Sequence, residues 1–75
     1  MRKTTKPTCF VNSDGTKSWW LNGELHRDNG LPAYEGADGT KEWWLNGKNF
    51  TEPEYFKKLY KLGKITKEEL FIHLI

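Results

Sequence analysis

Residues 14–23 read DGTKSWWLNG, and residues 38–47 read DGTKEWWLNG. Nine of these ten positions are identical at a spacing of 24 residues, and the same spacing relates Phe10 to Tyr34. Asp-Gly and Asn-Gly pairs favour two-residue hairpin turns, because type I′ turns need a positive φ at both central residues. The threonine and the tryptophan pair between the two turns favour a β-strand. Each unit is therefore predicted to be a strand, an Asp-Gly turn, an aromatic strand, an Asn-Gly turn and a short strand.

The β region is predicted to cover residues 8–50, where turn signals separate six segments that favour strands. We expect strands near residues 8–12, 16–21, 24–27, 33–37, 40–45 and 48–50. The sequence DNGLP at residues 28–32 connects the two units. Residues 1–7 carry Arg2, Lys3 and Lys6 and are predicted to form a basic N-terminal arm.

After residue 50 the apolar spacing changes from that of a strand to that of a helix. Two capping boxes, which mark helix starts, are expected at Thr51 with Glu54 and at Thr66 with Glu69. Gly63 is expected to end the first helix. The apolar faces that should pack on the sheet are formed by Tyr55, Phe56, Leu59, Tyr60 and Leu62, and by Leu70, Phe71, Leu74 and Ile75. The predicted fold is one domain of class α+β, with antiparallel β-hairpin repeats followed by a two-helix hairpin over residues 51–75.

Charge and cysteine content limit the class of protein. The net charge is +2, from 12 basic and 10 acidic residues, which is too balanced to indicate nucleic-acid binding by itself. Cys9 is the only cysteine, so an internal disulfide is impossible, and we expect Cys9 to be buried as a small apolar residue. No apolar run approaches that of a signal peptide or a membrane span. We therefore expect a cytoplasmic protein.

Residues that could carry catalysis or bind a metal are sparse. His26 and His73 are the only histidines, and they lie 47 residues apart, which fits no zinc-binding spacing. The paired glutamates of the two capping regions lie in expected first turns of helices, where the helix dipole favours acids. The glycines form neither a GxGxxG nor a Walker pattern. We predict no enzyme activity, no metal site and no cofactor.

The two tryptophan pairs are the clearest functional signal. Side chains alternate across a strand, so Trp19 and Trp43 should lie on one face, and Trp20 and Trp44 on the other. A chain of this size has little mass with which to cover both faces, and we expect at least one tryptophan to be exposed. Exposed Trp and Tyr anchor protein interfaces and also stack on single-stranded bases. The pattern leaves open which of these partners is bound and which member of each pair is exposed.

The units resemble MORN-type repeats, which are β-hairpin repeats of similar length with Tyr-x-Gly and Asn-Gly-x-x-His elements. The matching residues are Tyr34-Glu35-Gly36 and Asn22-Gly23-Glu24-Leu25-His26, and the sequence HRDNGLPA at residues 26–33 is similar to repeats of small bacteriophage proteins. The second unit departs from the pattern, since residues 48–50 replace the His-Arg stretch. The resemblance implies a scaffold or binding surface rather than a catalyst, and a phage origin would imply host takeover.

We therefore predict a non-catalytic protein-binding module, and the resemblance implies a phage-type inhibitor of a host protein or defence effector, anti-CRISPR-like, in the host cytoplasm. The predicted partner-binding residues are Trp20, Trp44, Trp19, Trp43, Tyr34, His26 and Arg27. A nucleic-acid-binding module is the first alternative, through exposed Trp and a lysine face that a solvated helix surface also explains, formed by Lys57, Lys58, Lys61 and Lys64. The second alternative is self-association as a homodimer, because repeat arrays usually need three or more units and two chains could join edge to edge.

Overall fold

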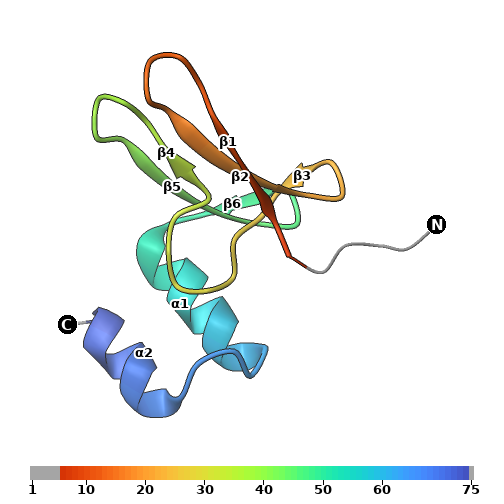
Figure 1. Ribbon diagram of the computed structural model, residues 1–75. Coiled ribbons are helices and arrows are strands. Elements are labelled where there is room, and N and C mark those ends of the chain that lie inside the picture. Colours follow the sequence, from red (N-terminus) through yellow and green to blue (C-terminus); the bar gives the residue numbers. More distant parts are fainter. Residues whose placement is uncertain (1–5, 75) are drawn as a thin grey trace.

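The computed structural model describes residues 6–74 and shows a sheet followed by two helices (Figure 1). The elements are β1 (Thr8–Val11), β2 (Lys17–Leu21), β3 (Glu24–Leu25), β4 (Tyr34–Glu35), β5 (Lys41–Leu45), β6 (Lys48–Phe50), α1 (Glu52–Lys61) and α2 (Lys67–Leu74). All strand pairs in this six-stranded sheet are antiparallel. The predicted class α+β is confirmed. Most of the predicted basic arm, residues 1–5, lies outside the described residues, as does Ile75.

The strands follow the order β1-β2-β4-β5-β6, and β3 also pairs with β2. Strand β4 pairs with both β2 and β5, so it lies between them. Residues 25–27 also lie between β2 and β5, at a different point along these two strands. His26 N donates to Trp19 O of β2 at 3.0 Å, and Arg27 N donates to Trp44 O of β5 at 3.1 Å. The chain therefore passes twice between the two aromatic strands, and the segment 28–32 bulges out between these passes toward α1 (Figure 1).

The two kinds of turn differ in their backbone. Asn22 and Asn46 both have a φ of 51°, and the glycine after each also has a positive φ, as the predicted type I′ turns require. The prediction of the same turn at the Asp-Gly pairs is wrong. Asp14 does not have a positive φ, and Gly15 N donates to Asn12 O at 3.0 Å. This is a three-residue loop with glycine at the bulge, which needs a positive φ only at that glycine.

The aspartate of each such loop serves as a hydrogen-bond acceptor. Asp14 Oδ1 accepts from Thr16 N at 2.9 Å, and Asp38 Oδ1 accepts from Thr40 N at 3.0 Å. These backbone hydrogen bonds hold the pKa of both carboxyls below their ordinary value. Their role at the hairpin tips is explained by turn geometry.

The core lies between α1 and one side of the sheet. Tyr55, Phe56 and Leu59 of α1 are fully buried, and they cluster with Leu45 of β5 and Leu70 of α2. Both predicted capping boxes are present, with Thr51 Oγ1 accepting from Glu54 N and the Glu54 carboxylate accepting from Thr51 N. The same exchange joins residues 66 and 69 ahead of α2.

The second helix packs chiefly on α1 rather than on the sheet. Leu70 is buried there, and the His73 ring stacks on Phe56 with centroids 3.7 Å apart and planes 4° apart. The predicted apolar faces are therefore only partly correct. Four of their members stay exposed on the helices; these are Tyr60, Leu62, Phe71 and Leu74.

Candidate functional site

The strand register sorts the side chains of the sheet onto two faces. Residues directly opposite each other in neighbouring strands share a face, and successive residues of a strand alternate. Trp43 and Leu45 contact the core residues of α1, so their side is the helix side. The opposite side, here called the outer face, carries nine strand residues: Thr8, Phe10, Ser18, Trp20, Leu25, Tyr34, Glu42, Trp44 and Asn49.

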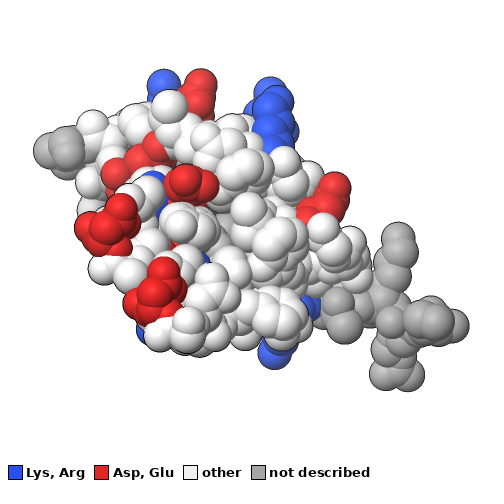
Figure 2. Space-filling model, turned by 90° about the horizontal axis from the view of Figure 1, so that it is seen from above, with Lys and Arg blue, Asp and Glu red and all other residues white. Residues whose placement is uncertain are grey.

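Aromatic side chains from four strands share the outer face. Phe10 of β1, Ser18 of β2, Tyr34 of β4 and Glu42 of β5 are consecutive partners in one row across the sheet. Phe10 is 56% exposed, and Trp20, in the neighbouring row, is 38% exposed. Tyr34 and Trp44 are half-buried. Figure 2 shows the molecule from above this side, where uncharged atoms dominate the middle and most charged side chains, acidic and basic, lie toward the borders.

The two outer tryptophans are held in place by matching hydrogen bonds. Trp20 Nε1 donates to Ser18 Oγ at 2.9 Å, and Trp44 Nε1 donates to Glu42 Oε1 at 2.9 Å. Each acceptor lies two residues upstream on the same strand, hence on the same face. Both indole rings are therefore oriented before any partner arrives, which reduces the entropy lost on binding.

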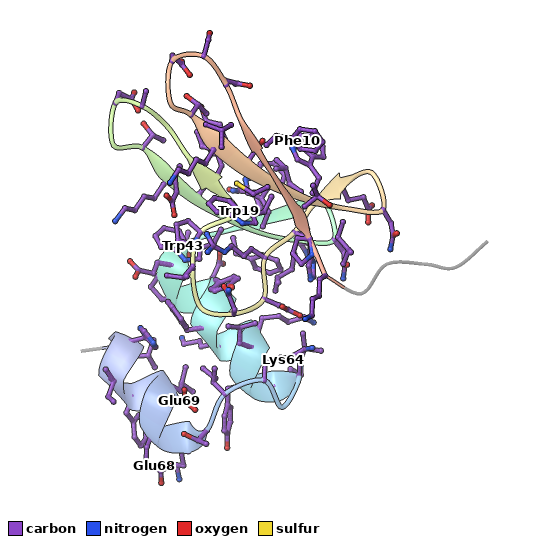
Figure 3. The ribbon with its side chains drawn as sticks, in the orientation of Figure 1. Phe10, Trp19, Trp43, Lys64, Glu68 and Glu69 are labelled. Carbon is purple, nitrogen blue, oxygen red and sulfur yellow. The ribbon has the colours of Figure 1, made fainter. Side chains whose placement is uncertain are left out.

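The other two tryptophans lie on the helix side and are covered there (Figure 3). The Arg27 guanidinium lies over Trp19, 3.7 Å from the ring centroid. Trp43 packs against Tyr55 with ring centroids 6.4 Å apart, and its buried indole N–H has no acceptor among the described residues. Trp19 and Trp43 occupy corresponding positions in the two units, yet a cation covers one and a helix covers the other.

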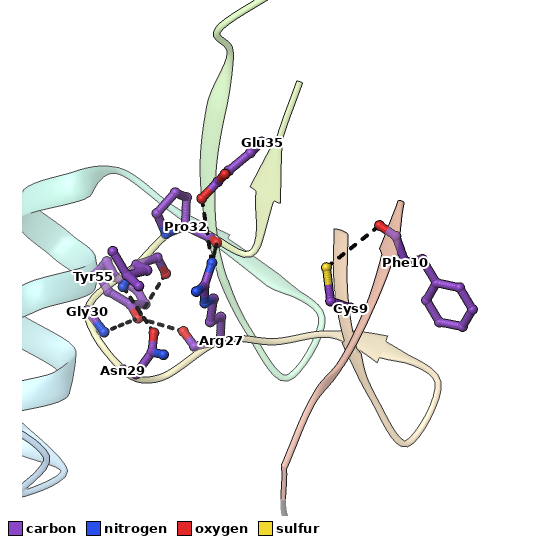
Figure 4. Close-up of polar contacts among 9 residues, drawn as sticks. Cys9, Phe10, Arg27, Asn29, Gly30, Pro32, Glu35 and Tyr55 are labelled. Carbon is purple, nitrogen blue, oxygen red and sulfur yellow. Dashed lines mark hydrogen bonds and ion pairs between the residues drawn. The ribbon is translucent and has the colours of Figure 1, made fainter. Parts of the chain in front are cut away.

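Arg27 and His26, two of the predicted partner-binding residues, have structural contacts. Arg27 Nη1 donates to Pro32 O at 3.1 Å and lies 3.5 Å from the Glu35 carboxylate, and its side chain is only 14% exposed (Figure 4). His26 is buried, and its Nδ1 accepts from Asn46 N at 2.9 Å. Both residues hold the segment 25–27 between β2 and β5, and neither side chain belongs to the outer face.

The connection 28–32 is fastened to α1 through Tyr55. The Tyr55 hydroxyl donates to Arg27 O and accepts from Gly30 N at 3.2 Å (Figure 4). Burial raises the pKa of Tyr55 to about 12. Burial would also raise the pKa of Asp28, but the Lys64 ammonium 3.2 Å away and His26 outweigh it, so the pKa of Asp28 is lowered.

The lysines of the alternative nucleic-acid site lie apart from the outer tryptophans. Lys57, Lys58, Lys61 and Lys64 are all exposed on α1 or just after it. Because α1 covers the helix side of the sheet, these lysines and the outer tryptophans do not share one surface. Lys64 is also paired with Asp28.

Two positions differ from the sequence-based expectation. Cys9 is exposed and not buried, because β1 lies at the edge of the sheet, beyond the reach of the helices. Phe10 was not among the predicted partner-binding residues, although it is the most exposed aromatic residue of the outer face. Its spacing of 24 residues from Tyr34, which was in the predicted set, is the signal that could have found it.

Among residues 6–74, no group of three or more His, Cys, Asp or Glu side chains could hold a metal ion. In the same part of the chain, no helix is both long and apolar enough to cross a membrane. The chain matches no protein-family model, no curated protein and no solved structure.

Proposed function

We propose that this chain is a non-catalytic protein-binding module whose outer face contacts one partner. The observation that carries the proposal is the set of oriented aromatic rings on that face, Phe10, Trp20, Tyr34 and Trp44. Tryptophan and tyrosine supply much of the binding energy at protein interfaces, since they bury a large area with few rotatable bonds. No part of the described chain covers this face, so its rings are available to be buried against another molecule.

The charge of the outer face favours a protein over a nucleic acid. Glu42 is the only charged residue among the nine, and its charge is negative. Lys17 and Lys41 of the same strands point to the helix side, because their neighbours in the sequence face outward. Single-strand binding needs cations along the phosphate backbone beside the stacking rings. The outer face has the rings without the cations.

The repeated sequence extends this proposal. We infer that the chain holds two units of a MORN-like repeat, with α1 and α2 closing the end of the second unit. The matching Asn-Gly turns and the matching bonds of Trp20 and Trp44 support it. MORN-type repeats serve as binding surfaces, and the similarity to phage repeats makes a bacterial host protein, such as a defence effector held inactive, the partner class that we propose.

A capture experiment tests the proposed function. The immobilised full chain is incubated with bacterial lysate, and proteins retained in proportion to the bait are identified. We expect Trp20→Ala and Trp44→Ala each to lower the retained amount at least tenfold, since central aromatic anchors typically contribute about 2 kcal/mol or more.

Phe71→Ala is the matched control, because Phe71 is an exposed aromatic residue on α2, away from the outer face. It should retain the partner as the wild type does. Loss with Phe71→Ala, together with retention by both tryptophan variants, would place binding on the helices and contradict the proposal.

A further inference from the structure

The first strand of the sheet has a free edge. Among the described residues, β1 pairs only with β2. Hydrogen-bonded and non-hydrogen-bonded pairs alternate along two antiparallel strands. Asn12 N donates to Thr16 O, so Asn12 belongs to a hydrogen-bonded pair. The next hydrogen-bonded pairs along β1 are therefore Phe10 with Ser18 and Thr8 with Trp20. The backbone N–H and C=O groups of Cys9 and Val11 therefore point outward, away from β2.

The molecule itself shows what such an edge binds. The repeat spacing of 24 residues relates β1 to residues 32–35, which include β4. Ala33 thus corresponds to Cys9, and Glu35 corresponds to Val11. Ala33 O accepts from Trp19 N at 2.9 Å, and Glu35 pairs with Lys17. In the second unit this edge thus joins an antiparallel strand, while the same edge of β1 has no partner strand among residues 6–74.

Strand β1 also lacks the features that keep an edge strand apart from others. Its four residues, Thr8-Cys9-Phe10-Val11, include no charge, no proline and no glycine, and all four are exposed. Phe10 on one side and Val11, 62% exposed, on the other leave both faces of the strand apolar. Exposed, uncharged edges of this kind pair with further strands.

We infer that β1 pairs with β1 of a second copy of this chain, antiparallel and about a twofold axis at Phe10. Outward groups belong to odd-numbered residues, so only registers that match odd residues form hydrogen bonds. When Cys9 pairs with Val11 of the other copy, each residue donates its N–H to the C=O of the other. The twofold axis produces this hydrogen-bonded pair twice. Centring on Cys9 instead would pair Val11 with Pro7, which has no N–H to donate.

Charge at the ends of the strand agrees with this direction. Lys6 precedes β1, and Asp14 lies in the hairpin loop after it. Antiparallel pairing centred on Phe10 brings each Lys6 toward Asp14 of the other copy, whereas parallel pairing would bring like charges together. The pairing also joins the two outer faces into one, with the two Phe10 rings next to each other at the centre.

This inference does not rest on the proposed function, because it is tested without any partner. Sedimentation equilibrium of the purified full chain over a range of concentrations should give twice the 8.8 kDa mass of one chain at the upper end. Cys9→Pro removes an outward N–H that β2 does not use, and edge strands tolerate proline there. We expect it to weaken dimerisation at least tenfold, and Cys9→Ser, which keeps the N–H, to leave it unchanged.

Crosslinking tests the register and does not depend on the proline variant. The Phe10 residues of the two copies would form a non-hydrogen-bonded pair with Cα atoms about 4.5 Å apart, within disulfide range. Cys9→Ser/Phe10→Cys should therefore oxidise to a covalent dimer. Cys9→Ser/Val11→Cys should remain uncrosslinked, because residues at 11 of both copies are diagonal neighbours roughly 7–8 Å apart.

Three results would overturn the inference. A wild-type chain that sediments as a monomer at every concentration excludes the dimer. A dimer that survives Cys9→Pro in a folded protein, judged by circular dichroism, excludes this edge. Faster crosslinking through position 11 than through position 10 excludes this register.

Discussion

Tyr55 connects the helical part of the molecule to the sheet with a single hydroxyl group. It donates to Arg27 O, just before the bulging connection, and accepts from Gly30 N, in the middle of that connection. Its ring is completely buried between Trp43 and Phe56. One side chain of α1 thereby fixes the position of the connection between the two units.

Tyr55→Phe should lower the free energy of unfolding by about 1–3 kcal/mol, since it keeps the ring and leaves two backbone groups without their partner. Urea unfolding followed by tryptophan fluorescence measures this change. Tyr60→Phe is the control, because the Tyr60 side chain is exposed, and it should change stability little. Equal effects of the two substitutions would show that the Tyr55 hydroxyl contributes nothing.

The stabilising effect of Tyr55 should depend on pH in the alkaline range. Its pKa is about 12 in the fold against an ordinary 10.0, so the folded state favours the neutral hydroxyl. The contribution is complete below pH 10.0 and is lost as pH rises toward about 12, because the unfolded state ionises first. The stability difference between wild type and Tyr55→Phe should shrink across this window. A difference that stays constant there would contradict the raised pKa.

The same residue type takes different roles on the two faces of one strand. Alternation predicted that Trp19 and Trp43 would share one face and Trp20 and Trp44 the other, and the register agrees. The sequence could not say which pair would be covered. That depends on which side of the sheet α1 packs against, and the alternation of residues along a strand does not determine this side.

The helices were predictable as elements because their signals are local. Each capping box needs only two residues three positions apart, and both boxes form as expected. The Asp-Gly turns were not predicted correctly, although their position was. Two-residue and three-residue loops both suit Asp-Gly, and the choice depends on the register between β1 and β2.

The two caps should contribute differently to stability. Thr51→Ala should cost about 0.5–2 kcal/mol of global stability, because α1 carries the fully buried core residues. Thr66→Ala removes the same hydrogen bond from α2, where Leu70 is the only buried residue. We expect it to loosen α2 locally and to change global unfolding less.

Native-state hydrogen exchange distinguishes these two effects. Amides of α2 should exchange faster in Thr66→Ala while those of β5 stay protected. Faster exchange of β5 in Thr66→Ala, to the same degree as in Thr51→Ala, would show that the two helices unfold as one unit.

At the scale of the whole molecule, α1 covers one side of a six-stranded sheet, α2 packs against α1, and the other side is left open by the described residues. The sequence predicted the order of the elements, since turns, strands and caps are local features. It did not predict the exposure of Cys9 and Phe10. Both lie on β1, and their environment depends on the number of neighbouring strands, which no local pattern encodes.

The separation of lysines from outer tryptophans predicts weak contact with nucleic acid. Titration with a single-stranded oligonucleotide at low salt should leave tryptophan fluorescence unquenched, because the outer face carries no cation among its nine residues. Quenching that disappears at moderate salt would instead support the nucleic-acid alternative.

The central claim is that the outer face, and not the helix side, binds a protein. The most direct test is to record the four indole N–H signals of the ¹⁵N-labelled chain by NMR while the captured protein is added. The signals of Trp20 and Trp44 should shift or broaden, and those of Trp19 and Trp43 should change much less. Larger changes at Trp19 and Trp43 than at Trp20 and Trp44 would contradict the account.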